Sequence, residues 1–135
     1  MILLNTTIQG QPRPKKNSMQ FKRLRNGRTV LLQSDTYNAY KDIFLLQIKS
    51  IWKNKEPISQ QVNVKCVYYR GDNRKCDLVN LQNGTLDLLV EAGVLKDDNY
   101  KVVYSMDGSR IFYDKDNPRV EITISTITKE DEKTK

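Results

Sequence analysis

Apolar and polar residues alternate in three separate stretches of the chain. From Ile2 to Ile8, from Val62 to Tyr68 and from Val120 to Ile124, the residues at every second position are mostly apolar. A period of two is typical of β-strands that have one face buried. Shorter apolar runs at residues 102–104 and 111–113 predict two further strands, on the two sides of a turn at Asp107-Gly108.

Helical spacing replaces this alternation between the first two of these strands. Aromatic and aliphatic residues recur there mostly at intervals of three or four, after a helix start at Ser34-Asp35 and before Pro57. They are Tyr37, Tyr40, Phe44, Ile48, Ile51 and Trp52. The spacing predicts an amphipathic helix whose stripe packs in the core; an aromatic platform for base stacking is the less favoured alternative.

A second helix is predicted from Asp77 to Leu95. Its apolar face consists of Leu78, Leu81, Leu88, Leu89 and Ala92. Gly84 lies on another, polar face, although a glycine costs a helix about 1 kcal/mol relative to alanine. We therefore expect another part of the backbone to approach the helix closely at Gly84.

Together these elements predict an α+β fold. We expect a single domain over residues 1–128, with a mixed β-sheet and two main helices, followed by a charged flexible tail at residues 129–135. A chain of 135 residues suits one domain and is too short for two. Asn26-Gly27 favours a tight turn, so the segment between the first strand and the first helix should double back as a hairpin.

The positive charge of the chain is concentrated near its N-terminus. The formal net charge is +7, and residues 1–34 contain seven of the 23 basic residues and no acidic residue. Because binding to phosphates releases counterions, such a segment is typical of an arm that binds nucleic acid; the alternative is a charged loop that only aids solubility. The basic residues of this arm are Arg13, Lys15, Lys16, Lys22, Arg23, Arg25 and Arg28.

The composition excludes several catalytic mechanisms and metal sites. Histidine is absent and the only cysteines are Cys66 and Cys76, which excludes Ser-His-Asp and Cys-His catalysis and the usual zinc sites. We expect both cysteines to be packing residues with free thiols, as in a reducing cytoplasm. No apolar run is long enough to cross a membrane, so we expect no membrane partner, and nothing points to a small-molecule cofactor.

Carboxylates stand at both ends of the second predicted helix. Asp77 opens it, and Asp97 and Asp98 follow its end; in a basic protein they are candidates for holding a divalent metal against phosphate, as in a nuclease. Locally, Asp77 also suits a helix N-cap and Asp97-Asp98 a polar turn. The two ends lie more than about 20 Å apart, because a helix rises about 1.5 Å per residue. A twofold dimer with antiparallel helices would bring Asp77 of one subunit near Asp97 or Asp98 of the other.

The same region resembles the RusA-like crossover junction endodeoxyribonucleases of phage or prophage type. The likeness includes Asp77-Leu78-Val79-Asn80-Leu81, the Ala92-Gly93 turn, Asp97-Asp98 and a basic loop at residues 10–18. It implies a RusA-like fold, an intertwined or antiparallel homodimer, and a Mg²⁺-dependent enzyme, with Mn²⁺ as the other candidate ion. The implied reaction is the resolution of four-way (Holliday) DNA junctions by paired nicks in recombination and repair, in the cytoplasm of a bacterium or a phage-infected cell.

The resemblance also implies roles for single residues. Asp77, Asp97 and Asp98 would be the catalytic metal ligands, and a second basic loop would hold DNA beside them, with an ordinary connection as the alternative; its residues are Arg70, Arg74 and Lys75. The family pattern has a second Asp and a Lys where this chain has Val79 and Asn83. Asp87 or Glu121 is the candidate auxiliary group for the missing carboxylate, and Lys75 or Lys96 is the candidate for the missing cation. Two alternatives therefore stay open: a catalytically weakened protein that binds branched DNA, and a regulatory protein-interaction module on the same fold.

Overall fold

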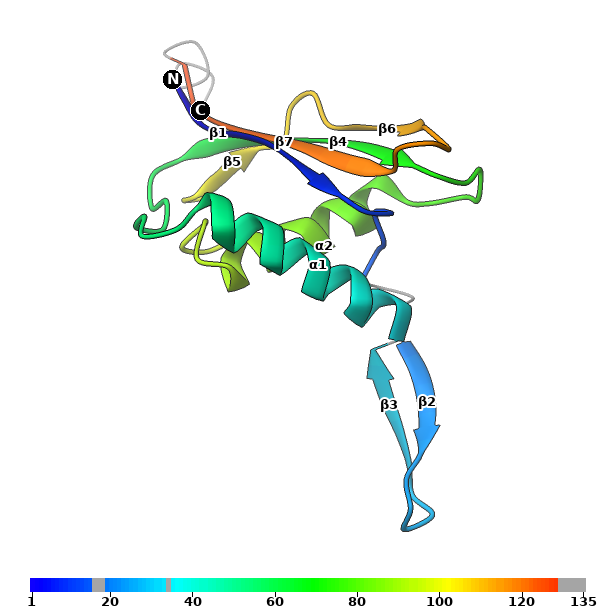
Figure 1. The fold of residues 1–135 in the computed structure, drawn as a ribbon. Coiled ribbons are helices and arrows are strands. Elements are labelled where there is room, and N and C mark those ends of the chain that lie inside the picture. Colours follow the sequence, from blue (N-terminus) through cyan, green and yellow to red (C-terminus); the bar gives the residue numbers. More distant parts are fainter. Residues whose placement is uncertain (16–18, 34, 129–135) are drawn as a thin grey trace.

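The computed structural model describes residues 1–15, 19–33 and 35–128, and these residues have an α+β fold. A five-stranded mixed sheet forms one layer, and two helices lie against one of its faces (Figure 1). Strands β1 (Ile2–Gln9), β7 (Arg119–Thr126) and β4 (Val62–Arg70) lie side by side in that order, and β7 is antiparallel to both of the others. The predicted fold class and the three alternating strands are confirmed.

The other edge of β4 pairs with two short strands, β5 (Val103–Ser105) and β6 (Arg110–Tyr113). Both run parallel to β4: β5 starts opposite Val62, the first residue of β4, and β6 ends opposite Arg70, the last. The predicted turn between them exists, and Gly108 adopts a φ of 89° there. However, this turn interrupts one edge of the sheet; the two strands pair with β4 and not with each other.

Helix α1 (Asp35–Ile51) supplies one half of the core beneath the sheet. Its buried residues are Tyr37, Tyr40, Phe44 and Ile48. They confirm that the aromatic stripe is a packing surface. Ile51 was expected to share this face, but it is 39% exposed, because the helical turn after Ile48 brings the next residue, Trp52, into the core in its place.

Helix α2 (Leu78–Glu91) supplies the other half of the core and ends before Leu95, its predicted end. Gly93 has a φ of 79°, its amide donates to the Val90 carbonyl at 3.0 Å, and the Val94 amide donates to the Leu89 carbonyl at 2.9 Å. A glycine in this left-handed conformation closes a helix and reverses the chain. The reversal buries Val94 and Leu95 in the core as part of a separate segment.

The basic arm contains a hairpin that stands away from the body of the molecule (Figure 1). Strands β2 (Met19–Arg23) and β3 (Thr29–Gln33) form it, and its turn lies at Asn26-Gly27 as predicted. The Arg28 amide donates to the Asn26 side-chain oxygen at 3.0 Å, and Gly27 has a φ of 84°. Lys16, Ser34 and the predicted tail at 129–135 lie outside the described residues.

Both cysteines carry free thiols. Cys66 lies in the core, where burial raises its pKa to about 12. Cys76 is half-buried, and burial raises its pKa as well. Neither α1 nor α2 has the length and apolar character needed to cross a membrane, as far as the described residues go.

Candidate active site

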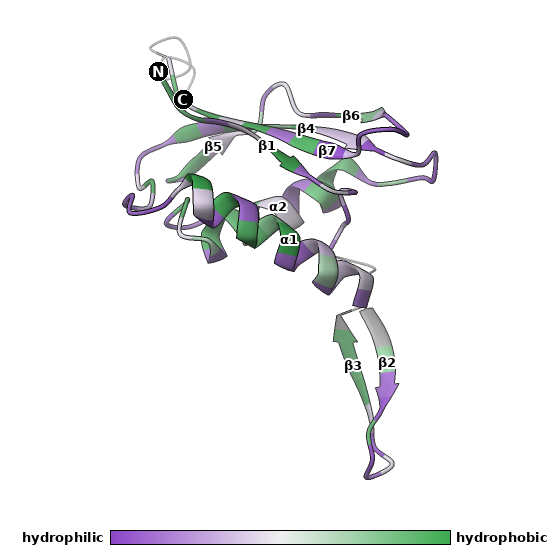
Figure 2. Cartoon of the chain, viewed as in Figure 1, coloured by the Kyte–Doolittle hydropathy of each residue, from purple (hydrophilic) through white to green (hydrophobic). Residues whose placement is uncertain are grey.

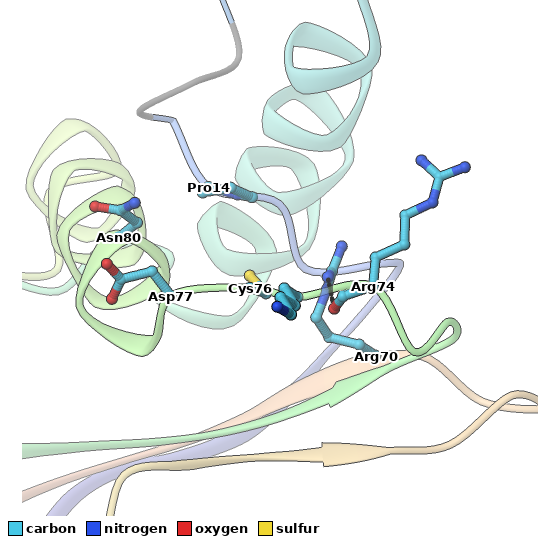
Figure 3. A pocket seen from close by; sticks show the side chains of 7 residues that line it. Pro14, Arg70, Arg74, Cys76, Asp77 and Asn80 are labelled. Carbon is cyan, nitrogen blue, oxygen red and sulfur yellow. Dashed lines mark hydrogen bonds between the residues drawn. The ribbon is translucent and has the colours of Figure 1, made fainter.

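A pocket of about 550 Å³ opens at the start of α2 (Figure 3). Three segments that are distant in sequence form it: the arm after β1, the loop after β4, and the first turn of α2. Its lining residues are Pro14, Arg70, Arg74, Lys75, Cys76, Asp77 and Asn80. The fold therefore brings the predicted first carboxylate together with the second predicted basic loop.

Asp77 occupies the N-cap position of α2. It has an extended backbone, with φ −85° and ψ 120°, and its Oδ1 accepts a hydrogen bond from the Val79 amide at 2.9 Å. The residue is exposed, so a ligand can reach its carboxylate. Asn80 stands beside it on the same turn (Figure 3). Sequence reasoning did not select Asn80 as a site residue, although its spacing of three from Asp77 places the two on one face of a helix.

The basic wall of the pocket contains two different kinds of residue. Arg74 and Lys75 are exposed, and the side chain of Arg74 extends outward (Figure 3). Arg70 is only 7% exposed, and its Nε donates to the Pro12 carbonyl at 3.3 Å. Its guanidinium also lies 3.6 Å from a carboxylate oxygen of Asp72. Arg70 thus joins the loop to the arm, while the other two cations face solvent.

The start of the arm is held against this loop and against α2. Gln11 accepts a hydrogen bond from the Gly71 amide at 2.6 Å and donates one to Asp72 at 3.2 Å. Farther along, the arm crosses α2 at Gly84, where an added Cβ atom would lie 3.4 Å from the Lys15 amide nitrogen. The predicted close approach of another backbone at Gly84 is confirmed, and the approaching segment is the basic arm itself.

Asp97 and Asp98 lie beyond the opposite end of α2. Both are exposed, and Asp97 accepts hydrogen bonds from the Asp98 amide at 2.7 Å and from the Asn99 side chain at 2.9 Å. The 14 residues of α2 separate this polar turn from Asp77, which corresponds to about 21 Å along the axis. Within the described part of the chain, no group of three His, Cys, Asp or Glu side chains is arranged to hold a metal ion.

Of the auxiliary candidates, Lys75 lines the pocket, whereas Asp87, Glu121 and Lys96 lie outside it, as do the two departures from the family pattern. Asp87 is 3.4 Å from the Lys15 ammonium. It also stands near Tyr37, whose pKa rises to about 12 through burial first and through the charges of Asp87 and Glu91 second. Lys96 is beyond the far end of α2, where its amide donates to the Ile58 carbonyl at 2.9 Å. Neither group lines the pocket beside Asp77.

The remaining basic residues of the arm are spread along its length. Arg13 and Lys15 lie where the arm crosses α2, and the hairpin carries the four others that the structure describes: Lys22, Arg23, Arg25 and Arg28. All four are exposed, and Lys22 contacts Asp35 at 3.2 Å. The basic surface therefore extends from the pocket out to the hairpin.

The outer face of the sheet carries a second charged cluster, which sequence reasoning did not find. Arg119 lies 3.7 Å above the ring of Tyr69 and contacts Asp114 at 2.9 Å and Glu121 at 3.2 Å. The hydrogen bond from Arg119 lowers the pKa of Asp114. Arg119 reaches Tyr69 because the two residues are paired across β4 and β7, so no pattern within one segment of the sequence predicts this contact.

Comparison with protein families gives one match that covers most of the chain. Residues 8–125 match the family described as endodeoxyribonuclease RusA. This range includes both helices, the hairpin and every residue of the pocket. No match to a curated protein was found.

Proposed function

Because the chain belongs to the endodeoxyribonuclease RusA family, we propose that it is a Mg²⁺-dependent nuclease that resolves four-way DNA junctions by paired nicks. The observation that carries this proposal is the pocket at the start of α2, where Asp77 shares one cavity with Arg74 and Lys75. Cations beside a carboxylate suit a phosphodiester, because the cations hold the phosphate and the carboxylate holds a metal ion. The activity would serve DNA recombination and repair in the cytoplasm of a bacterium or a phage-infected cell.

The residues of the pocket fit a magnesium ion. Mg²⁺ commonly binds through one or two carboxylates, keeps several waters, and contacts substrate phosphates. Asp77 offers a carboxylate and Asn80 an amide oxygen on the same helical turn. These two would hold the ion, and Mn²⁺ would suit the same oxygen ligands. When bound, the ion supplies polarisation of the scissile phosphate and activation of a water molecule.

The chain itself would bind and orient the DNA. Arg74 and Lys75 would contact the phosphates next to the scissile bond, and the positive end of the α2 dipole adds to this attraction. Arg70 would act as a positioning residue, because it ties the loop that carries these cations to the arm at Pro12. The arm would bind phosphates farther along the same DNA strand.

We propose that the enzyme works as a homodimer, with α2 of one subunit antiparallel to α2 of the other. Asp97 and Asp98 would then complete the partner's site, since about 21 Å of helix keeps them from Asp77 in their own chain. The exposed residues Val79, Asn83, Asp87 and Glu91 recur at intervals of four on α2. Asp87 and Glu91 form ion pairs with Lys15 and Lys41 of their own chain, so the contact would centre on Val79 and Asn83. Two such sites related by a twofold axis suit paired nicks in a symmetric junction.

A second candidate function is binding of branched DNA without efficient cleavage. Val79, which replaces a family Asp, is 57% exposed on the first turn of α2 and offers no oxygen ligand. Asn83 is also exposed and carries no charge. Phosphate binding would survive the loss of a metal ligand, because the arm supplies it independently. A regulatory module that binds a protein partner is the third candidate, and the exposed apolar residues of the hairpin are the feature that favours it.

Cleavage of a synthetic four-way junction and of a matched linear duplex, each with Mg²⁺ or with a chelator, tests the proposal. We expect nicks in the junction, none in the duplex, and none in the chelator. Tight junction binding with no nicks in Mg²⁺ or Mn²⁺ would favour the weakened binder. Absence of both binding and cleavage would favour the protein-interaction module.

A further inference from the structure

The β2–β3 hairpin exposes apolar side chains that nothing in the described chain covers. The two strands pair only with each other among the described residues and form a sheet of their own. Phe21 is 76% exposed, Leu31 52% and Leu32 42%. An isolated two-stranded hairpin is at best marginally stable in water. A binding partner that covers these side chains would therefore also stabilise the hairpin.

The strand register gathers the largest of these side chains on one face. Phe21 lies directly opposite Leu31, so the two point to the same side of the hairpin. The neighbouring pair of Lys22 and Val30 points to the other side. Figure 2 shows β3 as hydrophobic and the end of β2 near the turn as hydrophilic. The hairpin thus presents an aromatic ring supported by an aliphatic side chain, with cations close by.

The positive charge of the hairpin favours nucleic acid over a protein as its binding partner. Residues 19–33 contain Lys22, Arg23, Arg25 and Arg28 and no acidic residue. Lys22 points to the opposite face and contacts Asp35, so Arg23, Arg25 and Arg28 are the cations nearest the apolar patch. Cations beside such a patch suit phosphates next to a base, and an aromatic ring stacks on any base face that is free. A stable protein interface buries on the order of 1,600 Å², which is far more than one Phe–Leu pair offers.

The hairpin also lies within reach of the DNA that the pocket would hold. Pro14 lines the pocket, and Lys15 is the next residue of the arm. Four residues farther on, β2 begins at Met19, so its start lies within about 14 Å of Lys15. Five extended residues then carry the chain about 17 Å farther toward the turn. Phe21 follows Lys15 by six residues, so a DNA strand held at the pocket and a base within about 20 Å of Lys15 could be contacted together.

We propose that the hairpin enters the branch point of a four-way junction, where Phe21, supported by Leu31, stacks on a base whose stacking is interrupted at the branch. This inference rests on the proposed junction-resolving function and adds a role in substrate selection. Every base inside a linear duplex is stacked on both sides, so a ring can be inserted there only after two bases are unstacked. The bases at a branch point lose part of that stacking already. The hairpin would therefore favour junctions over duplexes, independently of the metal site.

The test uses a four-way junction with 2-aminopurine at the branch point, in a chelator that prevents cleavage. Binding of the wild-type protein should change the 2-aminopurine fluorescence, and Phe21→Ala should remove this change and weaken junction binding about tenfold, as expected for one stacked base. Phe21→Leu should show the same losses as Phe21→Ala, although it keeps an apolar pair with Leu31. Phe21→Trp should bind the junction like wild type. Leu46→Ala is the matched control, because Leu46 is also 76% exposed but lies on α1.

Several results would overturn the inference. One is that Phe21→Ala binds the junction and changes its fluorescence as wild type does. Another is that Phe21→Ala loses the same factor of affinity for the junction and for the linear duplex. A third is loss of the dimer in Phe21→Ala during sedimentation, which would assign the hairpin to a contact between subunits. The proposed nuclease activity is judged separately in Mg²⁺: nicks by wild type together with unaltered binding by Phe21→Ala would refute only the role of the hairpin. Phe21-dependent binding without nicks would refute only the cleavage.

Discussion

Asp77 is predicted to have two separable roles, as the N-cap of α2 and as a metal ligand. Its Oδ1 accepts the Val79 amide hydrogen bond at 2.9 Å, and an exposed N-cap of this kind contributes about 1 kcal/mol to stability. Asparagine can accept the same hydrogen bond but loses the attraction between a negative charge and the helix dipole, worth a few tenths of a kcal/mol. Asp77→Asn should therefore be almost as stable as wild type, and Asp77→Ala less stable by about 1 kcal/mol.

The loss in Asp77→Ala corresponds to a fall in Tm of about 3 to 4 °C for a domain of 135 residues. The cleavage rates of the two variants should not differ in the way that their stabilities do. Both variants remove a charged ligand, so both should cleave junctions at least about 100-fold more slowly than wild type. Thermal unfolding and single-turnover cleavage, measured on the same preparations, separate the two roles.

Asp42→Asn is the matched control, because Asp42 is an exposed carboxylate on α1 that does not line the pocket. It should retain both the Tm and the cleavage rate of wild type. Wild-type cleavage by Asp77→Asn would refute the ligand role. Equal Tm values for the Asn and Ala variants would refute the capping role, and the α2 start would then need another source of stability.

Three further predictions address the dimer, the arm and the charge. If each site combines Asp77 of one subunit with Asp98 of the other, mixing the inactive variants Asp77→Asn and Asp98→Asn should restore nicking, because heterodimers contain one intact site; no recovery after subunit exchange would mean that sites are not shared. Gly84→Ala should stabilise α2 by up to about 1 kcal/mol, since its Cβ would make ordinary contact with Lys15 at 3.4 Å, whereas Gly84→Leu should displace the arm and weaken junction binding. Unfolding curves and binding isotherms distinguish these, and tight binding by Gly84→Leu would contradict the proposed role of the arm. Replacing Arg25 and Arg28 by Gln should lower the slope of log affinity against log salt by about 2, while the same changes at Lys49 and Lys53 should leave it unaltered.

The pattern of apolar residues was enough to predict most of the fold. Strands and helices with a regular period were found at nearly the observed positions, because their burial depends on one covered face. The parallel pairing of β5 and β6 with β4 was not predictable in this way, since it depends on contacts between distant segments. The predicted end of α2 at Leu95 was wrong, because Gly93, whose positive φ makes it a helix terminator, ends the helix at Glu91.

The candidate site was predicted in part. The segment around Asp77 identified one side of the pocket, and Gly84 correctly indicated the close approach of the arm. The burial of Arg70 was missed, although the alternation in β4 gives the signal: residues 62, 64, 66 and 68 are buried, and one more step of two reaches Arg70. The arrangement of Asp97 and Asp98 relative to Asp77 depends on a partner subunit in our proposal, and one chain cannot report it.

The central claim is that the protein resolves junctions by paired cuts, and mapping the nicks tests it most directly. Each of the four strands of a junction is labelled in turn and incubated with excess protein and Mg²⁺ in single-turnover conditions. The proposal predicts nicks at symmetric positions on two opposite strands, with products that a ligase can seal. Nicks on one strand only, at scattered positions, or equally in a linear duplex would contradict it.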